Sequence, residues 1–174
     1  MDVAVLILRV IVGALFVGHG AQKLFGWFGG HGLTGTGGFF ESVGIKPGRP
    51  AAAAAGIAEL AGGLLFATGL LTPVAAGLII AVMTAAIVRV HWRQGLWISE
   101  GGAEYSLVLI AVAFAVTAIG PGKLSLDHAL GVDVVGLGWG LGALVTGLLA
   151  GLVAVAAGQL QARRHTGGAR PAGA

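Results

Sequence analysis

The chain has 174 residues, of which 56% are hydrophobic and only 10% are charged. A soluble domain carries about 25% charged residues, so this composition excludes an ordinary soluble fold and requires lipid as the solvent for much of the chain. The net charge of +3 is spread over short loops and a tail, which excludes a nucleic-acid-binding face, and the absence of cysteine excludes disulfides, iron–sulfur clusters and cysteine-bound zinc.

Five segments are long and apolar enough to cross a bilayer, which requires roughly 17–25 mostly apolar residues. They are residues 3–24, 51–71, 74–92, 103–119 and 134–157. The first is predicted to be a retained helix rather than a cleaved signal, because Asp2 stands where a positive region is needed and Arg9 interrupts the apolar run. The sequence therefore predicts one transmembrane domain over residues 1–158.

The connections between these segments carry their own signals. Pro73 lacks an N–H and is suited to begin the third helix. In the long connection after the first helix, Thr36 is a plausible N-cap and is followed by apolar residues at helical spacing, which predicts an interfacial helix over residues 36–44. Residues 159–174 are small and basic, and are expected to form a disordered tail.

The positions of lysine and arginine predict the orientation. With five crossings, eight of the ten basic residues fall on one side of the membrane. They are Lys23, Lys46, Arg49, Arg89, Arg93, Arg163, Arg164 and Arg170. The other side has Lys123 alone, and Arg9 lies inside a span. Because short cytoplasmic loops are enriched in basic residues, the N-terminus is expected outside and the C-terminus in the cytoplasm of a multi-pass protein of the cell membrane.

Ionisable residues within the spans gather at one depth. On the predicted topology, six of them lie in the inner third of the membrane and are the candidates for binding a ligand or handling protons: His19, Lys23, Glu59, Arg89, His91 and Glu104. His19 and Lys23 lie one helical turn apart on a face shared with Arg9. The sequence thus predicts one polar pocket near the cytoplasmic face.

Each of these residues also has a plainer interpretation. Lys23, Arg89 and Glu104 lie near helix ends, where long side chains can reach the headgroups. His91 stands beside Trp92 and can be interpreted as a residue of the membrane interface. Arg9 is expected to make an interior ion pair or to extend its side chain outward to water. Glu59 is different, because it has no easy route to water and needs a partner or a proton.

The last span carries a stripe of small residues. Gly136, Gly140, Gly147 and Gly151 fall on one narrow helical face, and such a face lets two helix backbones approach closely. We expect this face to pack on the bundle or on a second copy of the chain. No metal site is predicted, and haem is not expected, because His19 and His91 both lie near helix ends and no second histidine pair exists.

Several motifs in order resemble the DoxX family. They are "RVIVGALFVGHGAQKLFG", "LTGTGGFFESVGIKPG", "GIAELAGGLLFATGLLTP", the region of His91 and Glu104, and "GPGKLSLDHAL", within residues 9–130. The resemblance implies a four-helix membrane bundle, and it makes the six pocket candidates together with Arg9 and Asp127 this chain's versions of the family's polar positions. The segment after residue 133 departs from a minimal four-helix member. The fold class is therefore all-α, an integral membrane four-helix bundle with an additional fifth C-terminal transmembrane helix.

The resemblance also implies a link to redox chemistry, since the family's namesakes are small subunits associated with quinone-linked oxidation of thiosulfate. We expect a membrane subunit that partners a redox enzyme. Its polar cluster is expected to bind a quinone headgroup or to handle protons. Two other hypotheses remain open: a non-catalytic anchor or scaffold for a partner enzyme, and a small-molecule carrier that uses the same cavity. A homo-oligomer formed through the fifth helix is also compatible with the sequence.

The orientation is testable with reporter fusions. A C-terminal fusion to a reporter that is active only in the cytoplasm should give a signal, because the C-terminus lies on the side with eight basic residues, which is expected to face the cytoplasm. A silent cytoplasmic reporter, together with an active C-terminal fusion to a reporter that works only outside the cytoplasm, would contradict the predicted orientation.

Overall fold

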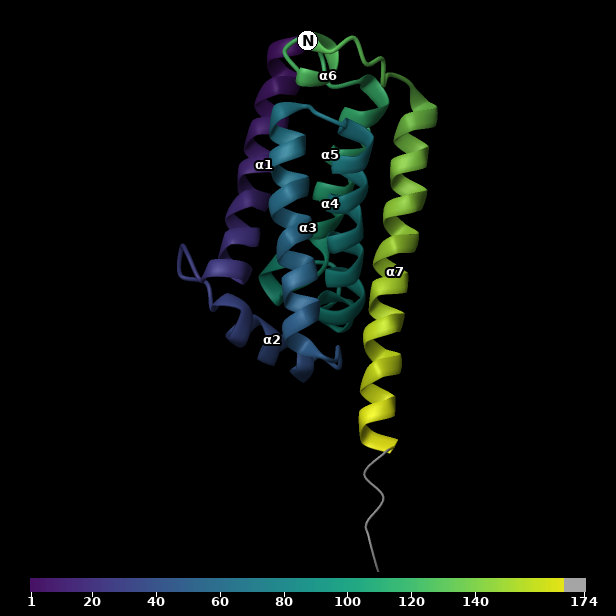
Figure 1. Cartoon of the computed structure of the whole chain (residues 1–174). Helices are drawn as coiled ribbons and strands as arrows, with labels where there is room; N and C mark the ends of the chain where they lie inside the picture. Colours follow the sequence, from purple (N-terminus) through teal and green to yellow (C-terminus); the bar gives the residue numbers. More distant parts are fainter. Residues whose placement is uncertain (168–174) are drawn as a thin grey trace, which may run out of the picture.

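The computed structural model describes residues 1–167, and these form an all-helical bundle (Figure 1). The elements are α1 (Asp2–Phe25), α2 (Gly32–Ser42), α3 (Gly48–Thr68), α4 (Thr72–Ala86), a π-helical turn η1 (Ile87–His91), 3₁₀ turns η2 (Trp92–Gln94) and η3 (Ile98–Glu100), α5 (Glu104–Ile119), α6 (Leu126–Ala129) and α7 (Leu137–Gly167). The long helices run up and down in turn, so that Met1 and the far end of α7 lie at opposite ends of the bundle (Figure 1).

Four helices are long and apolar enough to cross a membrane. They are Asp2–Phe25, Gly48–Thr68, Thr72–Gln94 and Leu137–Arg164. The remaining expected span, predicted over residues 103–119, is α5, which has 16 residues and is about 24 Å long, somewhat shorter than a hydrocarbon core of about 30 Å. It nevertheless lies in the bundle against α4 and α7. The predicted all-α membrane fold is confirmed.

Helix α2 begins earlier than the interfacial helix predicted over residues 36–44. It runs from Gly32 with His31 at the N-cap position, so Thr36 lies inside the helix and does not cap it. Gly26 ends α1 in the left-handed conformation, which glycine adopts without strain. The helix packs on α3 and α1, and Figure 1 shows it across the lower end of the bundle.

The last helix also differs from the prediction at both ends. It begins at Leu137, after Gly136 with φ of 122°, and it continues to Gly167. Residues 159–167, expected as tail, are therefore helical; residues 168–174, including Arg170, lie outside the described residues. Glutamine, leucine, alanine and arginine in this stretch all favour helix, so no breaker ends the helix where its apolar stretch ends.

Helices α1 and α3 make the closest contact in the bundle through glycines on both sides. A Cβ atom on Gly13 would lie 2.5 Å from the carbonyl oxygen of Gly63, and a Cβ atom on Gly20 would lie 2.8 Å from the carbonyl oxygen of Gly56. Side chains at these positions would force the backbones apart. The four glycines therefore fix the distance and register between α1 and α3.

The small-residue face of α7 packs on the bundle. A Cβ atom on Gly140 would lie 2.8 Å from the Ala118 side chain of α5, and one on Gly147 would lie 2.7 Å from the Ile80 side chain of α4. Gly151 is similarly close to the Ala81 carbonyl of α4. Gly136 is not part of this face, because it precedes the helix and has open space where a Cβ atom would lie. Its N–H donates to the Ala118 carbonyl oxygen of α5 at 3.0 Å.

The end of the bundle near the N-terminus is closed by buried polar side chains. Arg9 is fully buried and donates hydrogen bonds to the carbonyl oxygens of Pro121 at 2.6 Å and Leu124 at 2.5 Å. Asp127 is also fully buried, and accepts hydrogen bonds from the backbone N–H of Leu71 at 2.7 Å and from both the N–H and hydroxyl of Thr72 at 2.9 and 2.7 Å. It thereby caps the N-terminus of α4 across the chain.

The glycine face of α7 gives a stability prediction. Gly140→Leu combined with Gly147→Leu should destabilise the protein in detergent, because overpacking typically costs about 1–3 kcal/mol at each site. The measurement is thermal unfolding of the purified protein. The matched control is Gly138→Leu with Gly142→Leu on the same helix, where an added Cβ meets nothing within 4 Å. Equal stability of the two double variants would contradict the packing described here.

Candidate functional site

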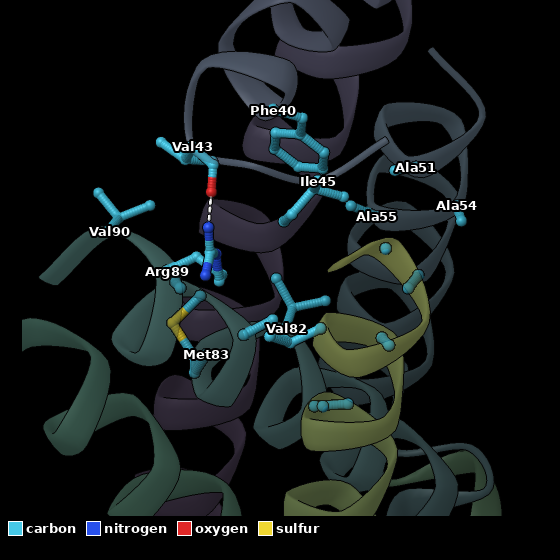
Figure 2. Close-up of a pocket in the computed structure, with 18 of the residues that line it drawn as sticks. Phe40, Val43, Ile45, Ala51, Ala54, Ala55, Val82, Met83, Arg89 and Val90 are labelled. Atoms are coloured by element: carbon cyan, nitrogen blue, oxygen red, sulfur yellow. Dashed lines mark hydrogen bonds between the residues drawn. The ribbon is translucent and has the colours of Figure 1, made fainter. Parts of the chain in front are cut away.

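A cavity of about 700 Å³ lies at the end of the bundle opposite Arg9. It is bounded by α1, α3, α4, α5, α7 and the connection between α2 and α3, and alanine and valine side chains make up much of its wall (Figure 2). Its polar lining residues are His19, Lys23, Lys46, Glu59, Arg89, His91, Tyr105, Ser106 and Gln161. Ligand sites commonly combine such apolar walls with a few converging polar groups.

An ion pair between α1 and α3 forms one polar part of the wall. The Nζ atom of Lys23 lies 2.8 Å from Oε1 and 2.7 Å from Oε2 of Glu59. The Glu59 side chain is 3% exposed and that of Lys23 is 22% exposed. The buried carboxylate thus has the partner that its depth requires, and the ammonium group retains hydrogen-bond capacity on its cavity side.

His19 is oriented by a neighbour on the same helix. Its Nδ1 atom lies 3.1 Å from Oε1 of Gln22, and the amide nitrogen of Gln22 donates to the carbonyl oxygen of Phe28 at 3.1 Å. Because the Gln22 amide group donates through its nitrogen, its oxygen is left to accept, and Nδ1 of His19 is the donor. In a neutral ring the Nε2 atom then carries the free lone pair.

A π-helical turn supplies the next polar groups. In η1 the helix widens, as shown by the Trp92 N–H donating to the Ile87 carbonyl, and consecutive residues Arg89, Val90 and His91 all line the cavity. Arg89 donates to the carbonyl oxygen of Val43 in the α2–α3 connection, and Figure 2 shows this bond between two residues that line the cavity. Its Nε atom is buried without a hydrogen-bond partner in the described part of the chain. Such turns are frequent at functional sites.

Helix α5 contributes a hydroxyl group that the sequence analysis did not single out. Ser106 is 3% exposed, lines the cavity and makes no side-chain hydrogen bond within the described residues. A serine in the first turn of an apolar helix is usually assumed to bond its own backbone, so its sequence position gave no warning. Here the buried hydroxyl is left for a group inside the cavity, as is the neighbouring Tyr105 side chain on the cavity rim.

The structure brings five of the six predicted pocket residues to this cavity and leaves one outside. Glu104 does not line it: the Oε2 atom of Glu104 accepts a hydrogen bond from the Ile98 N–H at 3.0 Å, so its carboxylate is turned toward the loop before α5. His91 lies at the rim, with Nδ1 2.6 Å from the Gly101 carbonyl oxygen. Arg9 and Asp127 serve the closed end of the bundle instead.

The polar groups of the cavity do not form a metal-binding set. Among the described residues no cluster of three or more histidine, aspartate or glutamate side chains could hold a metal ion. What the cavity offers is hydrogen-bond donors and one carboxylate, set in an apolar wall. This chemistry suits an organic molecule with oxygen acceptors.

Comparison with known proteins identifies the family of the chain. The DoxX family model matches residues 4–92, which is just over half of the chain and includes His19, Lys23, Glu59, Arg89 and His91. The chain belongs to the DoxX family. The match ends before α5 and α7, so Ser106 and the α7 wall of the cavity lie outside the part that the DoxX model describes.

Two relatives extend the similarity. The protein named putative oxidoreductase CatD of Bacillus subtilis is 32% identical over 126 residues, which cover 72% of this chain and 86% of the relative. The uncharacterized membrane protein Rv3486 of Mycobacterium tuberculosis is 31% identical over 137 residues, which cover 73% of this chain and 81% of the relative. No solved structure gives a significant match to the chain. The DoxX-family chain is thus a multi-pass membrane protein with relatives of similar length.

The Lys23–Glu59 pair gives a testable coupling. Lys23→Met should destabilise the protein by about 1–3 kcal/mol, because it leaves a buried carboxylate without its partner. Adding Glu59→Gln should recover part of this loss, since the orphaned charge is removed. Thermal unfolding of both single variants and the double variant measures the coupling. Lys46→Met is the matched control on the cavity rim, and strict additivity of the two substitutions would contradict a direct pair.

Proposed function

We propose that this protein is the quinone-binding membrane subunit of an oxidoreductase, with the quinone ring held in the cavity between α1, α3, α4, α5 and α7. The observation that carries the proposal is a buried, apolar-walled cavity whose polar groups are mainly hydrogen-bond donors. The name of the relative from Bacillus subtilis, a putative oxidoreductase, supports the same class of chemistry.

The chemistry of a quinone fits the groups present. A quinone has two carbonyl acceptors on a flat apolar ring and no donors, so it needs donors at its edges and hydrocarbon over its faces. The ammonium group of Lys23 and the hydroxyl of Ser106 are available donors on the cavity wall. Alanine and valine side chains supply the apolar surface. The volume lies in the usual range for a small-molecule site.

His19 and Glu59 are the groups that can move protons in this proposal. Reduction of a quinone to a quinol takes up two electrons and two protons; the electrons would come from a redox enzyme at the membrane, and the protons through side chains of the cavity. The free Nε2 of His19 can accept a proton from a quinol hydroxyl, and the protonated ring can return it. Glu59, held beside Lys23, is the second candidate for this role.

The two ends of the bundle favour binding over transport. A carrier must expose its cavity to each side of the membrane in turn. Here the end opposite the cavity is fixed by the buried hydrogen bonds of Arg9 and Asp127 to the surrounding backbone. Under the predicted orientation the cavity faces the cytoplasm, so the proposed redox partner and the proton supply are on that side.

Quinone binding gives the direct test. The purified protein should bind a benzoquinone analogue and its quinol. Because the quinol hydroxyls donate to acceptors, Glu59→Gln and His19→Ala should each weaken binding of the quinol by about tenfold, equivalent to 1.4 kcal/mol or one lost hydrogen bond to a polar ligand group. Quenching of tryptophan fluorescence or calorimetry in detergent measures the affinity, and thermal unfolding establishes that the variants remain folded.

The matched controls are Glu100→Gln and His128→Ala. Both residues are exposed and lie outside the cavity. Binding that is unchanged in the cavity variants, or lost equally in these controls, would contradict the proposed site. A wild-type protein that binds no quinone would refute the ligand and leave the cavity to another molecule.

A further inference from the structure

The cavity has a side opening within the membrane-spanning part of the bundle. Helices α3 and α7 both pack on α4, whereas direct contact between α3 and α7 is marginal at most in the described residues. Alanines from both helices line the cavity, and Ala54 of α3 and Ala154 of α7 are at the same time exposed on the surface of the bundle. Figure 2 shows Ala51, Ala54 and Ala55 on the α3 wall, across the cavity from Met83 and Arg89.

Fixed contacts bound this opening along α7. On one side Gly151 of α7 is held against α4 at Ala81. On the other side the carbonyl oxygen of Gly158 accepts a hydrogen bond from the Lys46 N–H at 3.2 Å, and a Cβ atom on Gly158 would lie 2.7 Å from the Ile45 side chain. Ala154 lies between these two attachments. The gap is therefore a defined window with α4 behind it.

We propose that this window between α3 and α7 admits the hydrocarbon tail of a membrane-resident ligand, whose polar head binds the donors inside the cavity. This inference rests on the proposed quinone site and names its substrate class: a quinone with a long isoprenoid or alkyl chain that reaches the site sideways from the bilayer. The head and tail are assigned to different walls.

The depth of the window requires a hydrocarbon occupant. Ala54 and Ala58 lie about 9 and 15 Å along α3 from its first residue at 1.5 Å per residue, and α3, with 21 residues, is about as long as the hydrocarbon core is thick. The opening thus faces acyl chains and not water. A molecule that passes through it gains the favourable burial of its methylene groups without leaving the membrane.

The polar head is assigned by an independent observation. The hydroxyl of Ser106 is buried on the α5 wall without a hydrogen-bond partner in the described residues, and the Lys23–Glu59 pair lies between α1 and α3. A purely apolar lipid chain would leave the Ser106 hydroxyl, which lines the cavity, without a hydrogen-bond partner. An amphipathic ligand would form this hydrogen bond with its polar head and fill the window with its hydrocarbon tail.

The test compares two ligands that share one ring. The probes are 2,3-dimethoxy-5-methyl-1,4-benzoquinone and the same ring with a ten-carbon chain, measured on the full chain in lipid nanodiscs. Ala54→Trp combined with Ala154→Trp narrows the window, and should weaken binding of the ten-carbon compound by about tenfold or more, since two buried methylene groups already contribute that much. Binding of the ring without a tail should change less than about twofold, a difference smaller than 0.5 kcal/mol.

The controls place tryptophan on the same helices but away from the window. Ile57→Trp of α3 and Val153→Trp of α7 are exposed positions that do not line the cavity, and should leave both affinities unchanged. If the window variant binds the ten-carbon compound as well as the wild type does, the proposal is wrong. Equal weakening of both compounds also overturns it, because the tryptophans then occupy the head site.

A second measurement separates the window from the identity of the ligand. The chain has no cysteine, so Ala58→Cys can be labelled alone with bimane. Phospholipids brominated on their acyl chains should quench this label in nanodiscs, as they quench a label on the lipid-facing Val153→Cys. If the label at Ala58→Cys is not quenched, lipid chains do not reach the cavity and the proposed window is refuted, even if quinone binds. Quenching without quinone binding supports the window and refutes only the proposed function.

Discussion

The close approach of α1 and α3 is the constraint on which the rest of the structure depends. Lipid provides little hydrophobic drive for two apolar helices to associate, so their contact must come from tight packing. The paired glycines provide it: a side chain at Gly13 or Gly20 would collide with the backbone of α3. This register places Lys23 opposite Glu59. Because separating the two charges is unfavourable, the ion pair in turn stabilises the register of the two helices. Packing and charge thus specify the same arrangement.

The two ends of the bundle use polar residues in different ways. At the end near α6, Arg9 and Asp127 donate to or accept from backbone groups of loops, so the polar atoms join the connections firmly to the helices. At the other end, the Ser106 hydroxyl lines the cavity without a side-chain hydrogen bond in the described residues. The Nε atoms of Arg9 and Arg89, one at each end, are buried without a partner in the same part of the chain. Unsatisfied buried polar groups are costly and uncommon in folded proteins. What distinguishes the two ends is that the polar side chains of the cavity face an open space, whereas those at the α6 end face the backbone of the loops.

The membrane segments and the depth of the polar residues could be predicted from the sequence, because apolar length and charge position are direct physical requirements of the bilayer. That logic brought Lys23 and Glu59 to one level and identified the packing face of α7, apart from Gly136. It placed Glu104 in the cavity, but depth does not fix the direction of a side chain, and a loop N–H was nearer. Ser106 was missed because its significance lies in an absent partner, and only coordinates can show that. The π turn at Ile87 likewise has no local sequence signal.

Helix α7 encloses a cavity whose other walls come from the first four long helices of the chain and the connection between α2 and α3. It is the wall of the cavity contributed by the last part of the chain, and it is held by glycine contacts with α4 and by one backbone bond to the connection before α3. A chain that stopped at residue 133 would keep the polar residues that line the cavity, apart from Gln161, in an open trough. For such a chain, a helix from a neighbouring subunit could complete the enclosure. In this protein the enclosing helix α7 belongs to the same chain. Closing the cavity therefore needs no association of subunits and does not depend on protein concentration.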